Sequence, residues 1–257
     1  MSWSAKQYTT FEQERTRPVR DLVAAIADIP GREVGLAVDL GCGPGNSTEV
    51  LAQRFAGATV TGLDNSEDML DAARKRMPGT AFELADIALW TAHRPVDVIL
   101  ANASLQWLPD HARLYPRLVG QLAPGGALAV QTPDNLEEPA HRLARELAAS
   151  GPWAGRIGDV RHPARHSADF YYALLHAHCT SVDVWRTTYF HPLAGGHQAV
   201  VEWFKGSALR PFVAPLDEAQ KADFYAAYLQ AISQAYPLLD DGTVLLPFPR
   251  LFIVARR

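Results

Sequence analysis

The run VDLGCGPGNS, residues 38–47, constrains the fold of this chain more than any other segment. An apolar strand ends in Asp39 and leads directly into a loop that carries Gly41, Gly43 and Gly45. Glycine is needed in such a loop because the chain turns sharply from strand to helix while its backbone lies against a ligand, and a Cβ atom would obstruct that approach. The run therefore predicts a βα unit with a nucleotide-binding loop.

The register of the glycines separates this loop from a dinucleotide-binding loop. In the dinucleotide pattern G-x-G-x-x-G the third glycine would stand where this chain has Asn46. Asp39, just before the loop, would repel phosphate and suits a cationic or hydroxyl-bearing ligand. An acidic residue at this point fits the amino acid end of S-adenosylmethionine. A tight turn that binds no ligand is the alternative interpretation of the motif taken alone.

Polar residues also end three further predicted strands. Asp64 closes TVTGLD about 20 residues beyond the loop, where a carboxylate can accept hydrogen bonds from both ribose hydroxyls. Asp86 follows TAFELA, and Asn102 ends VDVILAN. Because the carboxyl ends of parallel strands meet at one edge of a sheet, these residues and Asp39 are predicted to line one site. Alternatively, Asp64 caps the next helix, which Ser66 is predicted to cap in either case.

The order of elements predicts an α/β fold with a parallel sheet and helices on both faces. A helix is expected over residues 12–27, and strands over residues 34–40, 59–64, 81–85, 97–101, 126–131, 182–190 and 250–256. The segment LAPGG at 122–126 is predicted to be a turn, residues 151–165 a mobile loop, and residues 168–178 a helix. A helical insertion over 197–236 separates the last two strands, where it is well placed to cover a pocket.

Composition is consistent with one sizeable core, since 48% of the 257 residues are hydrophobic and 20% are charged. The net charge of −4 provides no general attraction for nucleic acid or membranes, so neither is an expected partner. No signal peptide or membrane span is readable, and a cytoplasmic protein is expected. Cys42 and Cys179 do not make a disulfide framework. His162 and His166 lack an acidic HExxH element, so no metal is expected.

Several longer segments carry a resemblance to a known family. They are FEQERTRP (11–18), DLGCGPGNST (39–48), ANASLQWLPDH (101–111), QTPDN (131–135), DVWRTTYFHP (183–192), ALRP (208–211) and FPRLFIVARR (248–257). In them the chain resembles the class I S-adenosylmethionine-dependent methyltransferases and, more narrowly, the trans-aconitate 2-methyltransferases. The glycine-rich loop is shared across the superfamily, whereas ASLQWLPDH and VWRTTYFHP are more specific.

The resemblance implies a Rossmann-like sheet of seven mostly parallel strands and methyl transfer from S-adenosylmethionine to a carboxylate of trans-aconitate. It implies one domain over residues 1–257, with an N-terminal helix (1–30), a cofactor-binding core (31–150) and substrate-covering segments (151–180 and 191–242). A carboxylate is already ionised at neutral pH, so no general base and no catalytic dyad are expected. The protein's task is to position the reactants.

The resemblance also implies which residues bind. Cofactor contacts are expected at Asp39, Gly41, Gly43, Gly45, Asp64, Asn65, Asp86, Ile87, Asn102 and Ala103. Substrate contacts are expected at Tyr8, Arg17, Gln106, Trp107, His191 and Arg210, with Gln106 and Trp107 nearest the transferable methyl group. Arginine suits this small polycarboxylate because guanidinium groups bind carboxylates through two parallel hydrogen bonds.

Alternatives stay open for these substrate residues. Arg210 could pair with an acidic neighbour, Arg17 could be a surface charge, and Trp107 could simply pack over the sheet edge. Arg186 and Arg250 are further candidates that could equally be surface charges at strand ends. Period-two alternation is taken to place one of Tyr189 and His191 in solvent.

Other functions also stay open. The fold would equally serve methylation of another small acid, or of a hydroxyl group with His191 as general base. The chain could also bind S-adenosylmethionine without turnover.

Overall fold

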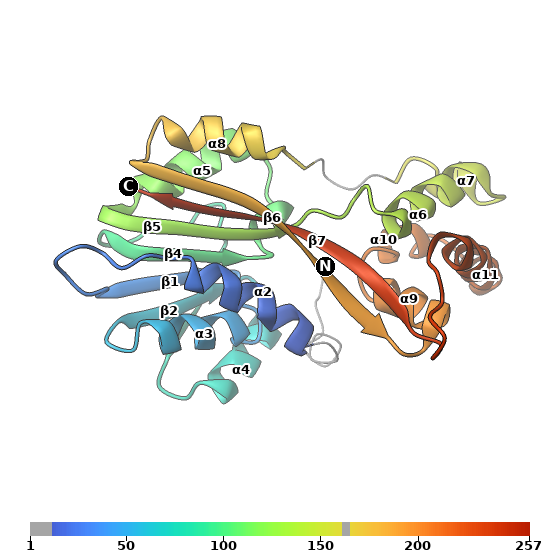
Figure 1. Cartoon of the computed structure of the whole chain (residues 1–257), viewed down its shortest axis with the longest axis horizontal. Coiled ribbons are helices and arrows are strands. Elements are labelled where there is room, and N and C mark those ends of the chain that lie inside the picture. The colour runs from blue at the N-terminus through green and yellow to red at the C-terminus, as the bar shows by residue number, and fades with distance from the viewer. Residues whose placement is uncertain (1–11, 161–164) are drawn as a thin grey trace. The chain divides into compact units, whose positions relative to one another are not determined.

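The computed structural model describes residues 12–160 and 165–257. Seven strands form one mixed, mostly parallel sheet in the order β3-β2-β1-β4-β5-β7-β6 (Figure 1). They are β1 (Leu36–Leu40), β2 (Thr59–Asp64), β3 (Ala81–Leu84), β4 (Val96–Asn102), β5 (Leu122–Pro133), β6 (Ser181–Leu193) and β7 (Val244–Arg256). Strand β1 pairs in parallel with β2 on one side and with β4 on the other. Strand β2 in turn pairs in parallel with β3, and β4 pairs in parallel with β5. The predicted seven-stranded α/β sheet is therefore confirmed.

Helices cover both faces of this sheet (Figure 1). They are α2 (Glu12–Ala24), α3 (Asn46–Arg54), α4 (Glu67–Arg76), α5 (His111–Gly120) and α8 (Ala168–His176). Right-handed crossovers explain the division, because β1-β2-β3 proceeds in one direction across the sheet and β1-β4-β5 in the other. The connecting helices α3 and α4 consequently lie on one face, together with α2, which precedes β1, and α5 and α8 lie on the opposite face (Figure 1).

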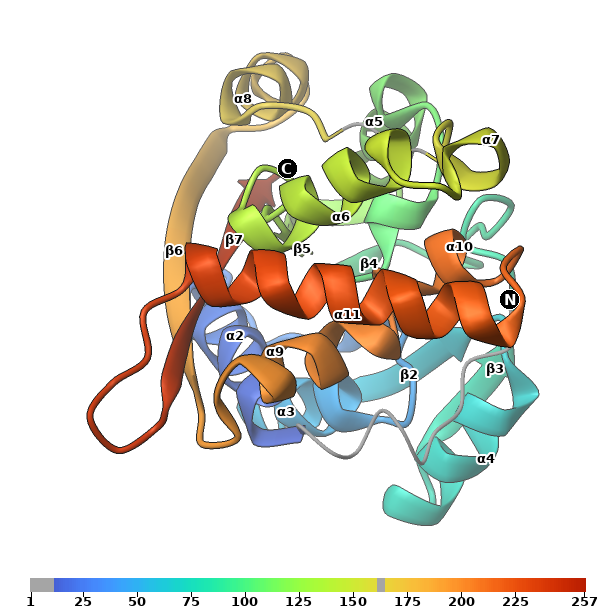
Figure 2. The ribbon, with the colours of Figure 1, turned by 90° about the vertical axis from the view of Figure 1, so that its right-hand side faces the viewer.

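A second group of helices packs together farther along the chain. It comprises α6 (Pro139–Ser150), α7 (Ala154–Ile157), α9 (Gly196–Lys205), α10 (Arg210–Val213) and α11 (Glu218–Ala235). Helix α11 packs against α6 and α9 (Figure 2). It begins with a capping box, in which the Asp217 side chain accepts from Gln220 N and the Gln220 side chain accepts from Asp217 N. The buried Tyr228 hydroxyl donates to Ala140 O at 2.9 Å and so ties α11 to α6.

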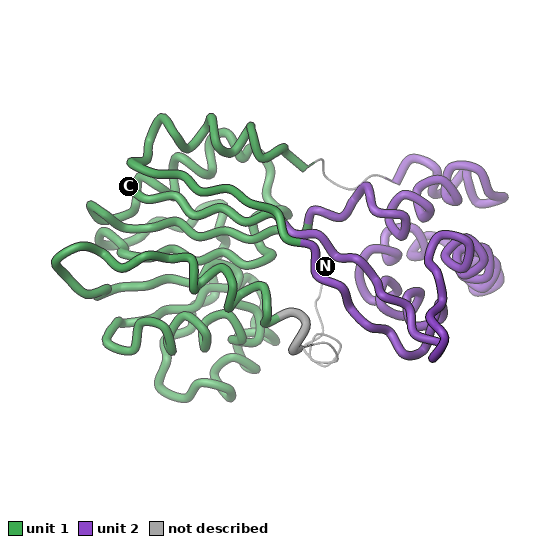
Figure 3. The backbone as a smooth tube through the Cα atoms, viewed as in Figure 1, with its two compact units in different colours: residues 1–133, 165–187, 251–257 green, residues 134–164, 188–250 purple. Residues whose placement is uncertain are grey.

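The chain divides into two compact units (Figure 3). Unit 1 comprises Met1–Pro133, Arg165–Thr187 and Leu251–Arg257, and unit 2 comprises Asp134–Ala164 and Thr188–Arg250. Strands β6 and β7 each contribute residues to both units. The single domain expected over residues 1–257 stays a prediction.

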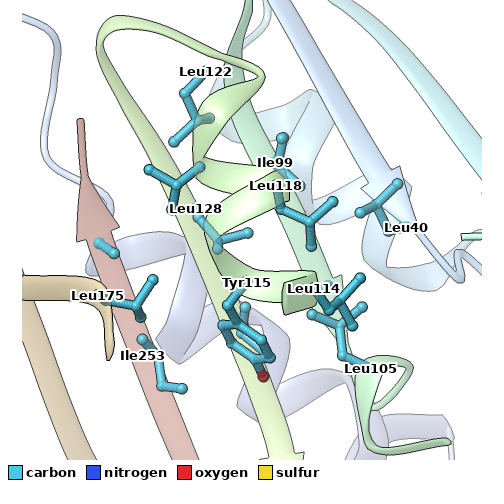
Figure 4. Close-up of a cluster of buried hydrophobic side chains, with 14 of the residues drawn as sticks. Leu40, Ile99, Leu105, Leu114, Tyr115, Leu118, Leu122, Leu128, Leu175 and Ile253 are labelled. Atoms are coloured by element: carbon cyan, nitrogen blue, oxygen red, sulfur yellow. The ribbon is translucent and has the colours of Figure 1, made fainter. Parts of the chain in front are cut away.

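One buried cluster of unit 1 lies where α5 and α8 meet the sheet (Figure 4). Tyr115 and Leu118 of α5 are fully buried, as are Ile99 and Leu128 on β4 and β5. Strand β4 is buried along nearly its whole length because helices cover it from both sides. This packing fixes the carboxyl end of β4 relative to its neighbouring strands.

One loop prediction is wrong, and a second is wrong in part. The segment at 122–126 belongs to β5, because Gly125, with a φ of 75°, accommodates an irregular register in which Val96 pairs with Leu122 and Val98 with Ala127. In the predicted mobile loop at 151–165, Ala154–Ile157 form helix α7 and residues 161–164 lie outside the described part, so the loop is shorter than predicted and its mobility stays a prediction. Trp153 is buried there, and its indole N–H donates to Leu147 O at 2.8 Å, which fastens α7 to the end of α6.

No described helix is long and apolar enough to cross a bilayer. Within the described ranges, no cluster of three or more His, Cys, Asp or Glu side chains is arranged to hold a metal ion. His162 lies outside those ranges.

Candidate functional site

The three glycines of the loop after β1 are all left-handed, with φ of 75° at Gly41, 53° at Gly43 and 90° at Gly45. A Cβ on Gly41 would lie 2.4 Å from Ser104 Cβ, and one on Gly45 would lie 3.2 Å from Ala73 Cα. These two glycines are therefore required by the packing of the loop against the protein. A Cβ on Gly43 would meet no atom within 4 Å, so this position borders open space.

That open space is a pocket at the carboxyl ends of β1, β2 and β4. It encloses about 840 Å³, part of which is open to solvent. Its lining consists of Gly41, Gly43, Asp64, Asn65, Met69, Asp86, Ile87, Asn102, Ala103, Ser104, Trp107 and Leu108. The strand order reverses between β1 and β4, which is where doubly wound sheets bind their ligands. Eight of the ten predicted cofactor residues line this pocket.

Asp64 joins the glycine loop to the end of β2. Its Oδ2 accepts a hydrogen bond from Gly43 N at 2.9 Å, and its Oδ1 accepts from Ser66 N at 2.9 Å. Burial raises the pKa of this carboxyl above its usual value, while these backbone hydrogen bonds act in the opposite direction. Each carboxylate oxygen has a second lone pair, so Asp64 can accept further hydrogen bonds from a ligand in the pocket.

Ser66 occupies the N-cap position of α4, but its side chain makes no capping hydrogen bond. Ser66 is thus the N-cap residue, as predicted, but its hydroxyl takes no part in the cap. The preceding Asp64 carboxylate accepts from the Ser66 N–H instead, because that side chain folds back over the turn.

Asp39 and Gly45, the other two predicted cofactor residues, lie outside the lining. Asp39 is fully buried behind the loop, and its Oδ2 accepts hydrogen bonds from Ser47 Oγ and Thr48 Oγ1, both at 2.7 Å. Its Oδ1 is buried without a partner in the described part of the chain. Burial raises the pKa of Asp39 to about 6. Asp39 thus holds the first turn of α3 against the loop, and a direct ligand contact stays a prediction.

The segment after β4 supplies another wall of the pocket. Asn102 and Ala103 line it, and the Oδ1 atom of Asn102 is buried without a hydrogen-bond partner among the described residues. The short 3₁₀ helix η2 (Leu105–Trp107) follows. Trp107 lines the pocket with half of its side chain exposed, whereas Gln106 is buried and lies outside the lining.

Sequence reasoning missed three lining residues, namely Met69, Ser104 and Leu108. Ser104 and Leu108 flank the predicted pair Gln106 and Trp107, so their position directly after β4 was an available signal. Met69 lies on the first turn of α4 and is buried. Its apolar side chain at helical spacing reads as core, and only the tertiary structure shows that it faces the pocket.

The predicted substrate residues are distributed over both units. Trp107, Gln106 and the exposed Arg17 of α2 belong to unit 1, whereas His191 and Arg210 belong to unit 2. Arg210 is exposed at the first residue of α10. Tyr8, the remaining candidate, lies outside the described residues.

One strand prediction concerning these candidates is wrong. Tyr189 and His191 are both buried, and Phe190 between them is 60% exposed. The reason is geometric, since residues two apart on a strand share one face. The His191 ring stacks on Trp203 of α9 with 4.8 Å between ring centroids.

The two weaker arginine candidates differ in burial. Arg186 is exposed on β6. Arg250 is buried on β7, and its guanidinium carbon lies 4.9 Å from the centre of the Phe248 ring.

The lining is suited to S-adenosylmethionine. Two carboxylates, Asp64 and Asp86, face a pocket that would repel a pyrophosphate and attract a ligand with ammonium and sulfonium charges. The buried Asn102 Oδ1 is an acceptor that still needs a donor. Gly43 leaves free the volume that a side chain would fill. All three features match a hydroxyl- and amino-bearing cationic nucleoside.

Comparison with known proteins agrees with this site. Residues 37–126 match the family model described as a methyltransferase domain. Over 257 aligned residues the chain is 54% identical to the trans-aconitate 2-methyltransferase of Methylobacterium nodulans, covering 99% of this chain and 98% of that protein. It is 51% identical over 261 residues to the trans-aconitate 2-methyltransferase of Rhizobium meliloti, covering 100% of this chain and 99% of that protein.

Solved structures at low identity support the fold. The YcgJ protein from Bacillus subtilis has a TM-score of 0.60 at 12% identity, over 94% of this chain and 98% of that chain. A putative methyltransferase from Bacillus halodurans has a TM-score of 0.57 at 14% identity, over 93% of this chain and 98% of that chain. The trans-aconitate 2-methyltransferases, at 51–54% identity over nearly the full length, are much closer in sequence than these solved structures. The chain therefore belongs to the family of the trans-aconitate 2-methyltransferases.

Proposed function

We propose that this protein transfers a methyl group from S-adenosylmethionine to one carboxylate of trans-aconitate, giving the monomethyl ester and S-adenosylhomocysteine. The observation that carries the proposal is the identity of 54% over 99% of the chain with a relative of that name. The carboxylate-lined pocket at the glycine loop supports it independently. A small polycarboxylate is thus the proposed partner, and a cytoplasmic location stays a prediction.

The residues that would hold the cofactor divide by chemistry. Asp64 would accept hydrogen bonds from the ribose hydroxyls, because its carboxylate lines the pocket at the end of β2. Asp86 and Ile87 would flank the adenine, one polar and one apolar. Asn102 would accept a hydrogen bond from the amino group at the cofactor's amino acid end through its buried Oδ1. When bound, S-adenosylmethionine supplies a methyl group activated by a sulfonium.

The protein's own contribution is positioning. The substrate carboxylate is ionised without help from a base, because its ordinary pKa lies well below neutrality. Holding the reactants in line contributes up to about 7–11 kcal/mol in favourable intramolecular cases. Trp107 would exclude water beside the transferred methyl group. Arg17, Arg210 and His191 stay predictions for binding the remaining carboxylates, as does the contact of Gln106.

The experiment that tests the proposal is mass spectrometry of the purified protein with S-adenosylmethionine and trans-aconitate. A base-labile monomethyl ester should form together with S-adenosylhomocysteine, and citrate should yield far less ester. Formation of S-adenosylhomocysteine with another acid but not with trans-aconitate would refute the substrate. Cofactor binding without any turnover would refute the reaction.

Variants then divide the site. We expect Asp64→Ala to weaken S-adenosylmethionine binding, and Arg210→Ala to raise the KM for trans-aconitate with nearly unchanged cofactor affinity. Arg142→Ala is a matched control, because Arg142 is an exposed arginine of unit 2 that pairs with Glu146 on the same helix. Equal loss of cofactor binding in Asp64→Ala and Arg210→Ala would contradict this division.

A further inference from the structure

The segment from Ala103 to Asp110 is strained at both ends. Ala103 has a φ of 52° and Asp110 a φ of 55°, which are the two left-handed non-glycine residues of the described chain. Such conformations persist only where the surrounding structure holds them, and they cluster at functional sites. Between them lies η2, whose Trp107 forms part of the pocket wall. The contacts that hold this segment therefore determine one wall of the site.

Three side-chain hydrogen bonds hold this segment in place. One is donated by a hydroxyl of the segment, and the other two reach its backbone carbonyls. Ser104 Oγ donates to Leu40 O at 2.6 Å, which joins the segment to the end of β1. His111 Nε2 lies 3.0 Å from Leu105 O, and Arg165 Nη1 donates to Gln106 O at 3.2 Å. His111 and Arg165 thus hold consecutive carbonyls of η2, and all of these residues belong to unit 1.

The hydrogen bonds of His111 specify its tautomer. Leu105 O can only accept, so Nε2 carries the proton and donates it. The other nitrogen, Nδ1, then accepts from the Tyr171 hydroxyl at 2.7 Å. His111 is the first residue of α5 and Tyr171 lies on α8, so the imidazole links η2 to α8 through α5. Because both ring nitrogens are occupied, the buried ring has one orientation.

We propose that His111 is a positioning residue for methyl transfer, which holds η2 and hence Trp107 against the reacting groups through the Leu105 carbonyl, with Tyr171 fixing the imidazole. His111 itself does not line the pocket. Its effect on the reaction passes through the backbone of η2. The inference rests on the proposed function and adds to it a residue that sets the geometry of the site.

Protonation of His111 would change its contact with Tyr171 and leave its hydrogen bond to Leu105 O in place. Burial lowers the pKa of His111, the hydrogen bond to the Leu105 carbonyl acts in the opposite direction, and the nearby His166 and Arg165 lower the pKa further. The ring faces Tyr115 on its own helix, at 5.3 Å between centroids, and His166 and Tyr171 at 5.4 and 5.8 Å. An imidazolium would turn Nδ1 into a donor toward a hydroxyl that now donates to it. The Nε2–H that donates to Leu105 O is present in both the neutral ring and the imidazolium, so the hold on η2 does not depend on the charge of His111.

Two variants of His111 separate its hydrogen bond from its bulk. His111→Phe removes both nitrogens and keeps a ring, whereas His111→Gln restores an N–H near the Nε2 position and has no group that titrates. The matched control is the double variant Tyr172→Phe with His176→Gln. These two residues form an exposed stacked pair on α8, the helix that carries Tyr171. The measurements are kcat and KM for trans-aconitate, the Kd of S-adenosylmethionine by calorimetry, and amide hydrogen exchange of residues 103–110.

We expect His111→Phe to lower kcat about tenfold or more, since small misplacements near the reacting atoms are costly. KM and Kd should stay within about twofold, because the lost interaction acts mainly in the transition state. His111→Gln should recover most of the kcat, because its amide N–H can donate to Leu105 O. The control pair should match the wild type throughout.

The opposite results would overturn the inference. Equal kcat in His111→Phe and wild type, or equal loss in the Phe and Gln variants, would show that the hydrogen bond to Leu105 does not position η2. Absence of ester from the wild type would instead refute the proposed function. In that case the exchange data decide the positioning alone: unchanged exchange over 103–110 in His111→Phe refutes it, and faster exchange confined to that segment supports it.

Discussion

Substitution of Gly43 by alanine should separate the strain of the glycine loop from its contact with the ligand. Gly43 has a φ of 53°, and a Cβ there would meet no protein atom within 4 Å. The only expected effect on the free protein is the left-handed conformation, which costs an L-residue about 1–2 kcal/mol. In a domain of this size that loss lowers the Tm by about 2–8 °C.

Gly43→Ala should also weaken ligand binding, independently of its effect on stability, because Gly43 borders the pocket. A methyl group forced into a filled contact costs about 1–3 kcal/mol, which corresponds to a loss of about 5- to 150-fold in affinity. Scanning calorimetry measures the Tm of the free variant, and titration calorimetry with S-adenosylmethionine and S-adenosylhomocysteine measures the Kd. We expect both losses in Gly43→Ala.

Gly31 supplies the matched control. It has a φ of 76°, is exposed, and likewise has no atom within 4 Å of an added Cβ. Gly31→Ala should lower the Tm by a similar amount and leave the Kd unchanged. Gly41→Ala should lower the Tm more than either, because its Cβ would lie 2.4 Å from Ser104 Cβ. Wild-type affinity in Gly43→Ala, or equal loss of affinity in Gly31→Ala, would refute the placement of the ligand against Gly43.

Three further predictions concern single side chains. Burial holds the folded pKa of Asp39 at about 6, above its ordinary value, so ionisation of this carboxyl lowers stability as pH rises from about 4 to about 6. Relative to the wild type, Asp39→Asn should therefore gain about 3 kcal/mol of unfolding free energy between about pH 4 and 7.5 in urea unfolding. A stability difference that stays constant with pH would contradict the burial effect. Asp97 accepts hydrogen bonds from Gly35 N at 2.7 Å and Leu36 N at 3.0 Å and pairs with Arg32 at 2.6 Å; burial opposes these contacts, but they hold the pKa of Asp97 below its usual value. The stabilising effect of Asp97 should be lost as pH falls below about 4. Asp97→Ala should lower the free energy of unfolding by about 1–3 kcal/mol at pH 7 and leave the cofactor Kd unchanged. A changed Kd would contradict a role confined to the amino end of the sheet. Trp107→Ala should change stability by less than about 0.5 kcal/mol, since half of the side chain is exposed, but should lower kcat/KM; unchanged kcat/KM in a steady-state assay would remove Trp107 from the site.

The parts of the site that could be predicted are those that the period and order of the strands determine. Asp64 and Asn102 are the last residues of their strands, and adjacency of β2, β1 and β4 brings them to one pocket. The glycine register was informative for a similar reason, since positive φ and close approach leave few alternatives to glycine. Strand positions in the core were likewise predictable, because continuous apolar runs mark buried parallel strands.

What the sequence could not show depends on contacts between distant segments. Met69 faces the pocket only because α4 packs in one orientation against the sheet. The sequence shows Asp39 as a polar residue at a strand end. It does not show that Ser47 and Thr48 donate hydrogen bonds to the Asp39 carboxylate, which lies outside the pocket lining. Trp153 fixes a segment rich in glycine and proline through one indole hydrogen bond, which no local propensity indicates. Strand geometry alone, by contrast, accounts for the burial of both Tyr189 and His191, because residues two apart on a strand share one face.

The position of β7 between β5 and β6 has a consequence for how the protein is made on the ribosome. Strand β6 is synthesised before the strand that separates it from β5, so it cannot dock until β7 has emerged. Until then the edge of β5 presents unpaired backbone groups, and such an edge is a template for association with other chains. Closure comes with the segment near Arg256 and Arg257, where Thr180 N donates to Arg256 O and Arg257 N donates to Gly126 O. Nascent chains that stall after β6 should consequently be the form of this protein that most needs protection by a chaperone.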